Sequence, residues 1–263
     1  MKNFKEIIEM ILTVDIGNTS TMCALFGEQG NLVAIFSFKT YIPVSSEEVL
    51  AKIKSFLDLY NIPLKDIKGM AIACVVPPAL KWWVEMGKRW LAREVVIANS
   101  ETVKIPVDLI YPSEIGADRL VNALAGWEKY KSSLIIVDFG TAITFDCISE
   151  KGVYLGGAIA PGLYISTEAL FKKTAKLPRI DLSEPVTRAI GKDTISALKS
   201  GLLFGFAGLT DHLIEKLSEE MRTSPRIIAT GGLAQFIYPY SKKIEKIDPY
   251  LTLEGLFYLW KRR

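Results

Sequence analysis

Two short segments of the sequence share one arrangement and lie nearly half the chain apart. Each is an apolar run that ends in an aspartate, with a glycine two residues further on: Asp-Ile-Gly-Asn-Thr from Asp15 and Asp-Phe-Gly-Thr-Ala from Asp138. An apolar run that ends at such a turn predicts a buried strand, and a second β-like segment follows each turn. One β-turn-β unit in each half of the chain predicts a duplicated fold with two lobes and a cleft between them.

The order of the remaining elements predicts an α/β fold. Apolar runs and alternating patterns predict strands over 11–15, 22–26, 32–38, 71–76, 95–98, 134–138, 144–148, 153–159 and 226–230. Apolar residues at helical spacing predict helices over 49–60, 80–91, 118–130, 163–174, 193–219 and 252–262. Because strands and helices alternate, we expect packed α/β layers, with one lobe over residues 1–115 and the other over residues 116–263.

The composition excludes several classes of protein. Of the 263 residues, 49% are hydrophobic and 23% are charged, which excludes an intrinsically disordered chain. The net charge of +3 is too even for a nucleic-acid-binding protein, which usually has a clear basic face. The uncharged stretch 152–167 is too short to span a membrane and contains several glycines and a proline. We therefore expect neither nucleic acid nor a membrane among the partners.

The cysteines indicate a cytoplasmic protein. Cys23, Cys74 and Cys147 lie far apart in apolar, strand-like runs, and the chain has a single histidine. This spacing fits neither a disulfide scaffold nor a Cys/His zinc site, and it predicts buried free thiols in a reducing compartment. Acidic residues near the start lie where a signal peptide would be apolar, so residues 1–9 are interpreted as an extension or an unused upstream start.

Each Asp-x-Gly turn has the features of a phosphate site. The glycine lets the backbone approach a ligand closely, and successive N–H groups in such a turn form a concave anion site. Hydroxyl groups that add donors after the two turns belong to Thr19, Ser20, Thr21, Thr141 and Thr144. The aspartates repel phosphate, but they can hold a cation or orient a water on Mg²⁺. The alternative is a plain tight β-turn in each case. The sequence contains neither a P-loop nor a Rossmann glycine pattern.

The segment Gly116-Ala-Asp-Arg has two interpretations. Asp118 lies just before Leu120, the first apolar residue of a predicted helix, and is a candidate for the helix N-cap. Alternatively, Asp118 is a base and Arg119 binds a carboxylate or phosphate. A carboxylate is a weak base for an alcohol, but the loose transition state of phosphoryl transfer depends more on placement of the acceptor than on base strength.

Two further glycine segments follow predicted strands, one with Gly156, Gly157 and Gly162, the other with Gly231 and Gly232. Glycines at such places permit close approach of the backbone to a flat or anionic ligand. They also occur in plain turns and at packing contacts. Both interpretations stay open for these two segments.

Seven segments, taken in order, resemble the type III pantothenate kinases. This family, also called the Bvg accessory factor family, belongs to the acetate and sugar kinase, Hsp70 and actin superfamily. The segments are Asp-Ile-Gly-Asn-Thr from 15, Gly-Ala-Asp-Arg from 116, Asp-Phe-Gly-Thr-Ala-Ile-Thr-Phe-Asp over 138–146, Gly-Gly-Ala-Ile-Ala-Pro-Gly over 156–162, Ala-Lys-Leu-Pro over 175–178, the Gly-Lys-Asp-Thr segment over 191–201 and Thr-Gly-Gly over 230–232. The resemblance begins at about Met10 and implies an actin-like (ribonuclease H-like) duplicated fold with two lobes and a central cleft.

The resemblance also implies an activity. Members of the family transfer a phosphoryl group from ATP to the 4′-hydroxyl of pantothenate, which is the first committed step of coenzyme A biosynthesis. They act as homodimers and need Mg²⁺ as the divalent metal together with K⁺ or NH₄⁺. The alternatives are a kinase for another small hydroxylated acid and a nucleotide-binding regulatory protein without turnover.

The same resemblance implies roles for individual residues. The residues implied to bind ATP are Asp15, Ile16, Gly17, Asn18, Thr19, Ser20, Thr21, Met22 and Thr141. The residues implied to bind pantothenate are Gly116, Ala117, Asp118, Arg119 and, across the dimer interface, Thr194. Within this set Asp118 is the proton acceptor. The implied metal-binding residues are Asp138 for K⁺ or NH₄⁺ and Asp15 for Mg²⁺ through a water.

Two positions depart from the family pattern. Leu109 stands where many members have a tyrosine that contacts the substrate, although Tyr111 is close by. Asp193 stands where asparagine is usual, and it adds a charge next to Thr194. We therefore expect either that the pantothenate pocket is built differently or that Tyr111 replaces the missing side chain.

Overall fold

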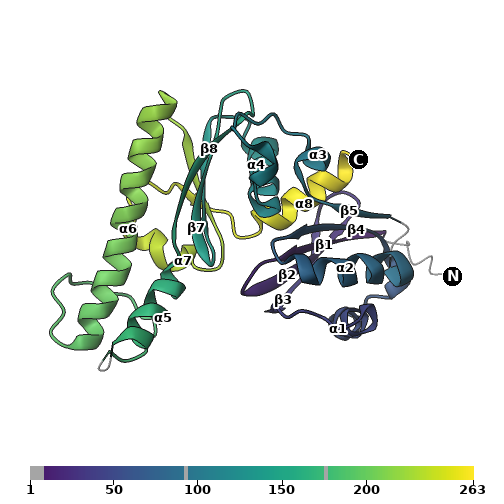
Figure 1. Ribbon diagram of the computed structural model, residues 1–263, viewed down its shortest axis with the longest axis horizontal. Helices are drawn as coiled ribbons and strands as arrows, with labels where there is room; N and C mark the ends of the chain where they lie inside the picture. The colour runs from purple at the N-terminus through teal and green to yellow at the C-terminus, as the bar shows by residue number, and fades with distance from the viewer. Residues whose placement is uncertain (1–8, 92–93, 175–176) are drawn as a thin grey trace, which may run out of the picture. The chain divides into compact units, whose positions relative to one another are not determined.

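The computed structural model describes residues 9–91, 94–174 and 177–263, which form two compact units. The first unit consists of the described part of Met1–Ile105 with Tyr111–Glu128 and Thr252–Arg263; the second consists of Pro106–Ile110 and the described part of Lys129–Leu251. Each unit contains its own β-sheet (Figure 1). Residues 1–8 of the proposed N-terminal extension and residues 175–176 of the Ala-Lys-Leu-Pro segment lie outside the described residues.

The sheet of the first unit is mixed. Its described strands are β1 (Met10–Ile16), β2 (Ser20–Gly27), β3 (Leu32–Lys39), β4 (Ile67–Cys74) and β5 (Glu94–Ile97). Their order across the sheet is β3-β2-β1-β4-β5. The pairs β1–β2 and β2–β3 are antiparallel, whereas β1–β4 and β4–β5 are parallel.

The sheet of the second unit repeats this topology. Its described strands are β6 (Leu134–Phe139), β7 (Ala142–Ile148), β8 (Tyr154–Pro161), β9 (Arg226–Thr230) and β10 (Lys246–Ile247). Their order is β10-β9-β6-β7-β8, with antiparallel β6–β7 and β7–β8 pairs and parallel β6–β9 and β9–β10 pairs. Read from β8 to β10, the second sheet has the same order and directions as the first, with β6 in the place of β1. This match confirms the duplication that the two Asp-x-Gly turns predict.

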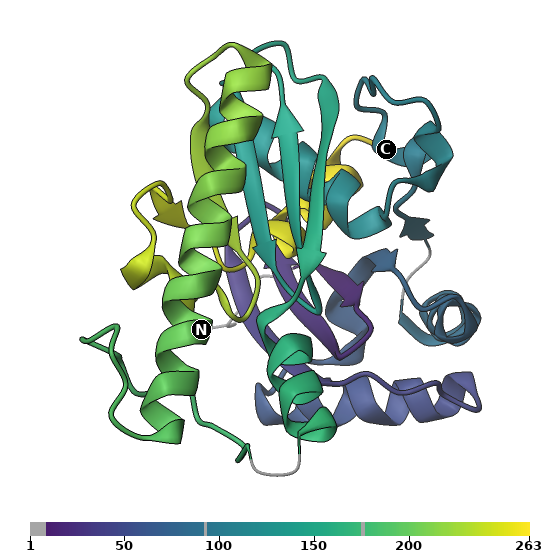
Figure 2. The same ribbon diagram turned by 60° about the vertical axis from the view of Figure 1, so that its left-hand side comes forward.

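Helices cover a face of each sheet. The described α-helices are α1 (Ser46–Leu59), α2 (Pro77–Met86), α3 (Ser100–Val103), α4 (Ala117–Tyr130), α5 (Leu163–Lys173), α6 (Thr194–Met221), α7 (Ala234–Ile237) and α8 (Leu251–Lys261). In the first unit, α1 and α2 lie beside each other and pack on the sheet (Figure 1). In the second, the long helix α6 runs along the sheet and shares a core with β6 and β7 (Figure 2).

Local sequence explains most of these boundaries. Ser45 is the N-cap of α1, where its hydroxyl accepts a hydrogen bond from the N–H of Glu48. Pro77 and Pro78, predicted to stop a strand, form the first turn of α2, where a missing N–H costs no hydrogen bond. The sequence patterns do not predict α3, α7 or β10, because elements this short carry no periodic signal.

The C-terminal helix α8 packs on the first unit. A Cβ placed on Gly69 of β4 would overlap the ring of Trp260, and one placed on Gly30 would lie 3.0 Å from the ring of Phe257. The hydroxyl of Thr252 donates to Asn122 Oδ1 of α4 at 2.8 Å. The sequence predicts two lobes that meet between residues 115 and 116. The compact units are divided differently, since most of α4 and nearly all of α8 group with the first sheet.

The three cysteines are free thiols, as predicted, with Cys23 and Cys147 buried and Cys74 half-buried. Among the described residues, no helix combines the length and apolar character needed to cross a membrane.

We expect Gly69→Ala to lower the free energy of unfolding by about 1–3 kcal/mol, because the added methyl group overlaps the ring of Trp260. In a Trp260→Phe background the same substitution is expected to cost less, since the smaller ring leaves room. Denaturant unfolding of the four proteins measures this coupling. Equal costs in the two backgrounds would show that the Trp260 ring does not restrict residue 69.

Candidate active site

The turn between β1 and β2 is held in place from the end of β3. The N–H of Gly17 donates to the carbonyl of Ser20 at 3.1 Å and closes the turn. Thr40 then binds the turn twice: its hydroxyl donates to the carbonyl of Gly17 at 2.7 Å and its N–H donates to the carbonyl of Thr19 at 3.0 Å. The turn is therefore fixed, while the side chains of Asn18, Thr19 and Ser20 are exposed.

Asp15 lies at the end of the central strand of the first sheet, half-buried between Met22 of β2 and Ala73 of β4. Burial raises the pKa of the Cys23 thiol well above its usual value, and the Asp15 carboxylate raises it further. Burial also raises the pKa of the Cys74 thiol, and the Asp15 carboxylate adds to this effect, whereas a hydrogen bond from the N–H of Val76 opposes it. Both thiols therefore stay protonated at neutral pH, which argues against a nucleophilic role for either cysteine.

The Gly116–Arg119 segment forms the start of α4. The N–H of Leu120 donates to the carbonyl of Gly116 at 3.1 Å, which is the first hydrogen bond of the helix. Asp118 thus lies inside the first turn, and the interpretation of this residue as the N-cap is wrong. A carboxylate in the first helical turn interacts favourably with the positive end of the helix dipole.

The position of the Asp118 carboxylate depends on its neighbours. Its Oδ1 accepts a hydrogen bond from the N–H of Arg119 at 2.9 Å. A Cβ placed on Gly116 would overlap the same oxygen, so glycine is required there for this side-chain position. Gly116, Ala117, Asp118 and Arg119 are all half-buried. The carboxylate is therefore both held and partly accessible.

Asp138 occupies in the second sheet the position that Asp15 occupies in the first. It is the penultimate residue of β6 and lies between Thr144 of β7 and Thr230 of β9. The turn that follows is closed by a hydrogen bond of 3.1 Å from the N–H of Gly140 to the carbonyl of Ala142. Asp138 is half-buried, as is Thr141 in the turn.

Glycines from two distant segments pack against this second turn. Gly231 has a φ of +87°, and a Cβ there would overlap Asp138 Oδ1. A Cβ placed on Gly162 would overlap the carbonyl of Thr141 and lie 2.8 Å from that of Gly140. The packing interpretation is therefore confirmed for Gly231 and Gly162. Their missing side chains leave the Asp138 carboxylate and the turn backbone room that any other residue would fill.

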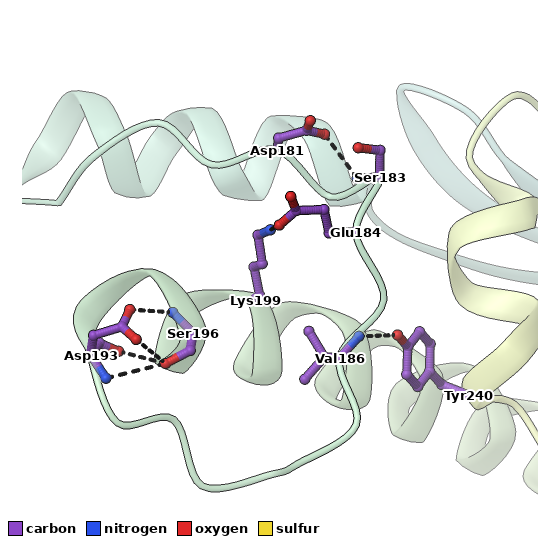
Figure 3. A network of polar contacts seen from close by, with 8 residues as sticks. All are labelled: Asp181, Ser183, Glu184, Val186, Asp193, Ser196, Lys199 and Tyr240. Carbon is purple, nitrogen blue, oxygen red and sulfur yellow. Dashed lines mark hydrogen bonds and ion pairs between the residues drawn. The ribbon is translucent and has the colours of Figure 1, made fainter.

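Thr194 is the first residue of α6 and is exposed. The preceding Asp193 is the helix N-cap: its Oδ1 accepts a 2.9 Å hydrogen bond from the N–H of Ser196 (Figure 3). This bond and that of the Ser196 hydroxyl lower the pKa of Asp193. The negative charge of Asp193 is thus stabilised by the helix start.

The loop before α6 is tied to the second unit by polar contacts. Lys199 Nζ of α6 lies 2.8 Å from Glu184 Oε2, and the N–H of Val186 donates to the hydroxyl of Tyr240 at 2.7 Å (Figure 3). A Cβ placed on Gly191 would overlap the backbone of Ala197. The position of Thr194 is therefore set by both its helix and this loop.

The predicted site residues fall into two groups, one in each unit. The first unit holds the turn at 15–22 and the segment at 116–119, and the second holds Asp138, Thr141 and Thr194. Thr40, which fixes the first turn, was not predicted, because it lies far along the chain and belongs to no motif. Leu109 lies beside Gly156 in the second unit. Tyr111, the residue expected to replace the missing tyrosine, is exposed.

The two groups offer different chemistry. The first turn presents polar side chains and a carboxylate, and turns of this type bind phosphate through their N–H groups. The start of α4 offers a carboxylate and a guanidinium on adjacent residues, suited to a hydroxyl and an anionic group of one ligand. Within the described ranges, no cluster of three or more histidine, cysteine, aspartate or glutamate side chains could hold a metal ion.

The sequence is similar to proteins of one family over nearly its whole length. The family model described as type III pantothenate kinase matches residues 11–216. A type III pantothenate kinase from Geobacter sulfurreducens is 42% identical over 255 residues, covering 96% of this chain and 99% of the relative. One from Desulfatibacillum aliphaticivorans is 41% identical over 254 residues, covering 96% and 98%.

Solved structures with the same fold have low sequence identity. A structure described as a Baf family transcriptional activator from Campylobacter jejuni has a TM-score of 0.61 and 22% identity, covering 95% of this chain and 98% of its own. Component A of the (R)-2-hydroxyglutaryl-CoA dehydratase from Acidaminococcus fermentans has a TM-score of 0.58 and 13% identity, covering 96% and 98%. These structures share the fold over nearly the whole chain and confirm the predicted duplicated α/β fold class.

We expect Gly231→Ala to lower the free energy of unfolding by about 1–3 kcal/mol, because alanine is strained at positive φ and its methyl group displaces the Asp138 carboxylate. Gly232→Ala is the matched control: nothing lies within 4 Å of a Cβ there, and we expect a change below about 0.5 kcal/mol. Denaturant unfolding measures both. Equal effects of the two substitutions would contradict the packing of Gly231 on the second turn.

Proposed function

The chain belongs to the type III pantothenate kinase family, and on that premise we propose that it transfers the γ-phosphoryl group of ATP to the 4′-hydroxyl of pantothenate. The product is 4′-phosphopantothenate, the first intermediate of coenzyme A biosynthesis. The observation that carries the proposal is the start of α4, where Gly116 leaves room for a half-buried Asp118 carboxylate beside Arg119.

Asp118 is proposed as the proton acceptor for the pantothenate hydroxyl. The N–H of Arg119 donates to this carboxylate, and the absence of a Cβ on Gly116 leaves room for it. Because the transition state of phosphoryl transfer is loose, aligning the hydroxyl with the γ-phosphorus contributes more than base strength. The guanidinium of Arg119 is suited to the carboxylate of pantothenate, which it can bind through two parallel hydrogen bonds.

The first turn, from Asp15 to Met22, is proposed to bind the phosphates of ATP, and Thr141 of the second turn to contact the nucleotide. The hydrogen bonds from Thr40 support this role, since a turn of fixed conformation loses little entropy when a ligand binds. The exposed side chains of Asn18 and Ser20 are available as further donors.

Asp15 and Asp138 are proposed to act on cations. Mg²⁺ is usually held by one or two carboxylates, waters and substrate phosphates, which suits a single carboxylate, Asp15, acting through water. The half-buried carboxylate of Asp138 is proposed to hold the K⁺ or NH₄⁺ ion. Bound cations would offset the negative charge of the triphosphate during transfer.

The protein is proposed to act as a homodimer in the cytoplasm. Large apolar side chains exposed on α5 and α6 are those of Tyr164, Ile165, Leu170, Ile195 and Phe204. Gly201, Gly205 and Gly208 lie at helical spacing on α6, and nothing lies within 4 Å of a Cβ at any of them. Exposed apolar side chains and open glycines on these helices are suited to close packing against a second copy, which would also cover Thr194 at the start of α6.

We expect Asp118→Asn to lower kcat by about 10²- to 10⁴-fold with little change in KM for ATP, because the amide cannot accept the proton. A coupled assay of ADP formation with pantothenate, Mg²⁺ and K⁺ measures this. Gln29→Glu, at an exposed position of the first unit outside every proposed contact, serves as the control. Equal activity of Asp118→Asn and the parent would refute the role of Asp118.

The same assay tests the two alternative functions. A preference for another acid in a panel of small hydroxylated acids would favour a kinase for that acid. ATP binding without ADP formation would favour a nucleotide-binding regulatory protein.

We expect the activity to require K⁺ or NH₄⁺ and to be lost in Na⁺ alone, because the smaller Na⁺ ion holds its hydration water more tightly and gives it up less readily to the Asp138 carboxylate. In Asp138→Asn we expect the half-saturating concentration of K⁺ to rise at least about tenfold, since the neutral amide attracts the ion less. Titration of initial rates with KCl at constant ionic strength measures it. An unchanged K⁺ dependence in Asp138→Asn would place the cation elsewhere.

We expect the protein to sediment as a dimer at micromolar concentration and Gly205→Glu to sediment as a monomer of 29.3 kDa, because a charge on the exposed face of α6 opposes packing. Gln29→Glu adds the same charge at an exposed position of the first unit and is expected to leave the dimer intact. A monomeric parent protein would overturn the proposed dimer.

A further inference from the structure

A β-bulge at the start of β8 turns one side chain toward a buried carboxylate. Strands β7 and β8 pair regularly as far as Cys147 with Gly156, after which the register shifts and Ile148 pairs with Tyr154. Gly156 has a φ of +108°, a conformation that other residues rarely adopt. Because side chains alternate between the faces of a sheet, the shift places Tyr154 on the same face as Asp146.

Asp146 and Tyr154 form a buried pair within the second unit. The Asp146 side chain is inaccessible to solvent, and Tyr154 is 1% exposed. The hydroxyl of Tyr154 donates to Asp146 Oδ1 at 2.7 Å. The Asp146 Oδ2 atom also lies 3.5 Å from the Thr144 hydroxyl, and loss of the shorter bond from Tyr154 would remove one donor from a buried carboxylate, which is costly. The pair therefore fixes the position of Tyr154 at the end of the sheet.

The backbone of Tyr154 in turn holds a short segment from another part of the chain. Its N–H donates to the carbonyl of Pro106 at 2.9 Å, and its carbonyl accepts from the N–H of Asp108 at 2.9 Å, with Val107 forming a parallel bridge. The side chain of Leu109 lies 3.1 Å from the position of a Cβ on Gly156. These contacts explain why residues 106–110 group with the second unit while the chain on both sides groups with the first.

The segment 106–110 leads directly into the proposed acceptor site. Gly116 lies six residue steps after Ile110, and a chain of that length spans at most about 20 Å when fully extended. Whatever fixes residues 106–110 therefore limits where Gly116–Arg119 can lie. No part of the proposed chemistry uses Asp146 or Tyr154, and neither is exposed to a ligand.

We propose that Asp146 and Tyr154 are positioning residues for pantothenate binding, which act by anchoring residues 106–110 on β8 and so setting the placement of the Gly116–Arg119 segment. This inference rests on the proposed function of that segment. It assigns no chemical step to either residue: the effect is on acceptor binding and passes through the backbone.

The test compares Tyr154→Phe with Tyr130→Phe, a matched control in the same unit. The hydroxyl of Tyr130 donates to Asp248 Oδ2 at 2.9 Å, so each substitution removes one hydroxyl from an aspartate. Burial and the bond to Asp248 raise the pKa of Tyr130 to about 12, so this hydroxyl stays protonated throughout the assay range. Tyr130 lies outside the segment that the proposal concerns.

We expect Tyr154→Phe to raise KM for pantothenate at least about fivefold while KM for ATP stays within about twofold, and Tyr130→Phe to change neither. Hydrogen exchange of the Asp108 amide is expected to accelerate in Tyr154→Phe alone, since its acceptor is the Tyr154 carbonyl. Asp146→Asn keeps an acceptor for the tyrosine hydroxyl and is expected to raise KM for pantothenate less than Tyr154→Phe does.

The inference is overturned if Tyr154→Phe changes KM for pantothenate no more than Tyr130→Phe, or raises the KM values of both substrates equally, as general destabilisation would. If the parent protein does not phosphorylate pantothenate, the proposed function fails by itself. Hydrogen exchange then decides on the anchor: faster exchange at residues 106–110 and 116–119 in Tyr154→Phe supports it, and exchange equal to that of Tyr130→Phe refutes it.

Discussion

An aspartate near the end of a central strand, with a paired strand on each side, is the constraint on which both units depend. Asp15 and Asp138 each lie between one antiparallel and one parallel neighbour, so hydrogen bonds on both sides fix the backbone that carries the carboxylate. The residues around them preserve that position. Thr40 holds the first turn through hydrogen bonds, and the absence of a side chain on Gly231 leaves room for the Asp138 carboxylate. The rigidity of the sheets is thus passed directly to the two turns.

The chain passes between the units more than once, and this arrangement relates the fold to the proposed chemistry. The start of α4 groups with the first sheet, but the chain that enters it is bound to β8 of the second unit through Tyr154. The Gly116–Arg119 segment is therefore attached to elements of both units through short stretches of chain. Such an attachment supports a role in positioning an acceptor for phosphoryl transfer, where placement contributes more than base strength.

Two carboxylates in or next to the proposed site accept hydrogen bonds from the local backbone. Asp118 accepts from the next N–H in its helix, and Asp193 accepts from Ser196 at the start of α6. Each carboxylate lies near a helix N-terminus, where the dipole favours negative charge. The cap at Asp193 uses an oxygen that asparagine and aspartate both provide, so either residue fits this helix start.

The sequence by itself determined the strands and long helices, the duplication and the family, because apolar periodicity and the Asp-x-Gly turns are local signals. It did not separate a helix N-cap from a first-turn residue at Asp118, since the two positions differ by only one or two residues in an otherwise identical pattern. Only the tertiary structure decided that Gly231 packs on Asp138 and that the bulge at Gly156 turns Tyr154 toward Asp146. Those contacts join residues on different strands, and their geometry depends on register and backbone angles that no short stretch of sequence specifies.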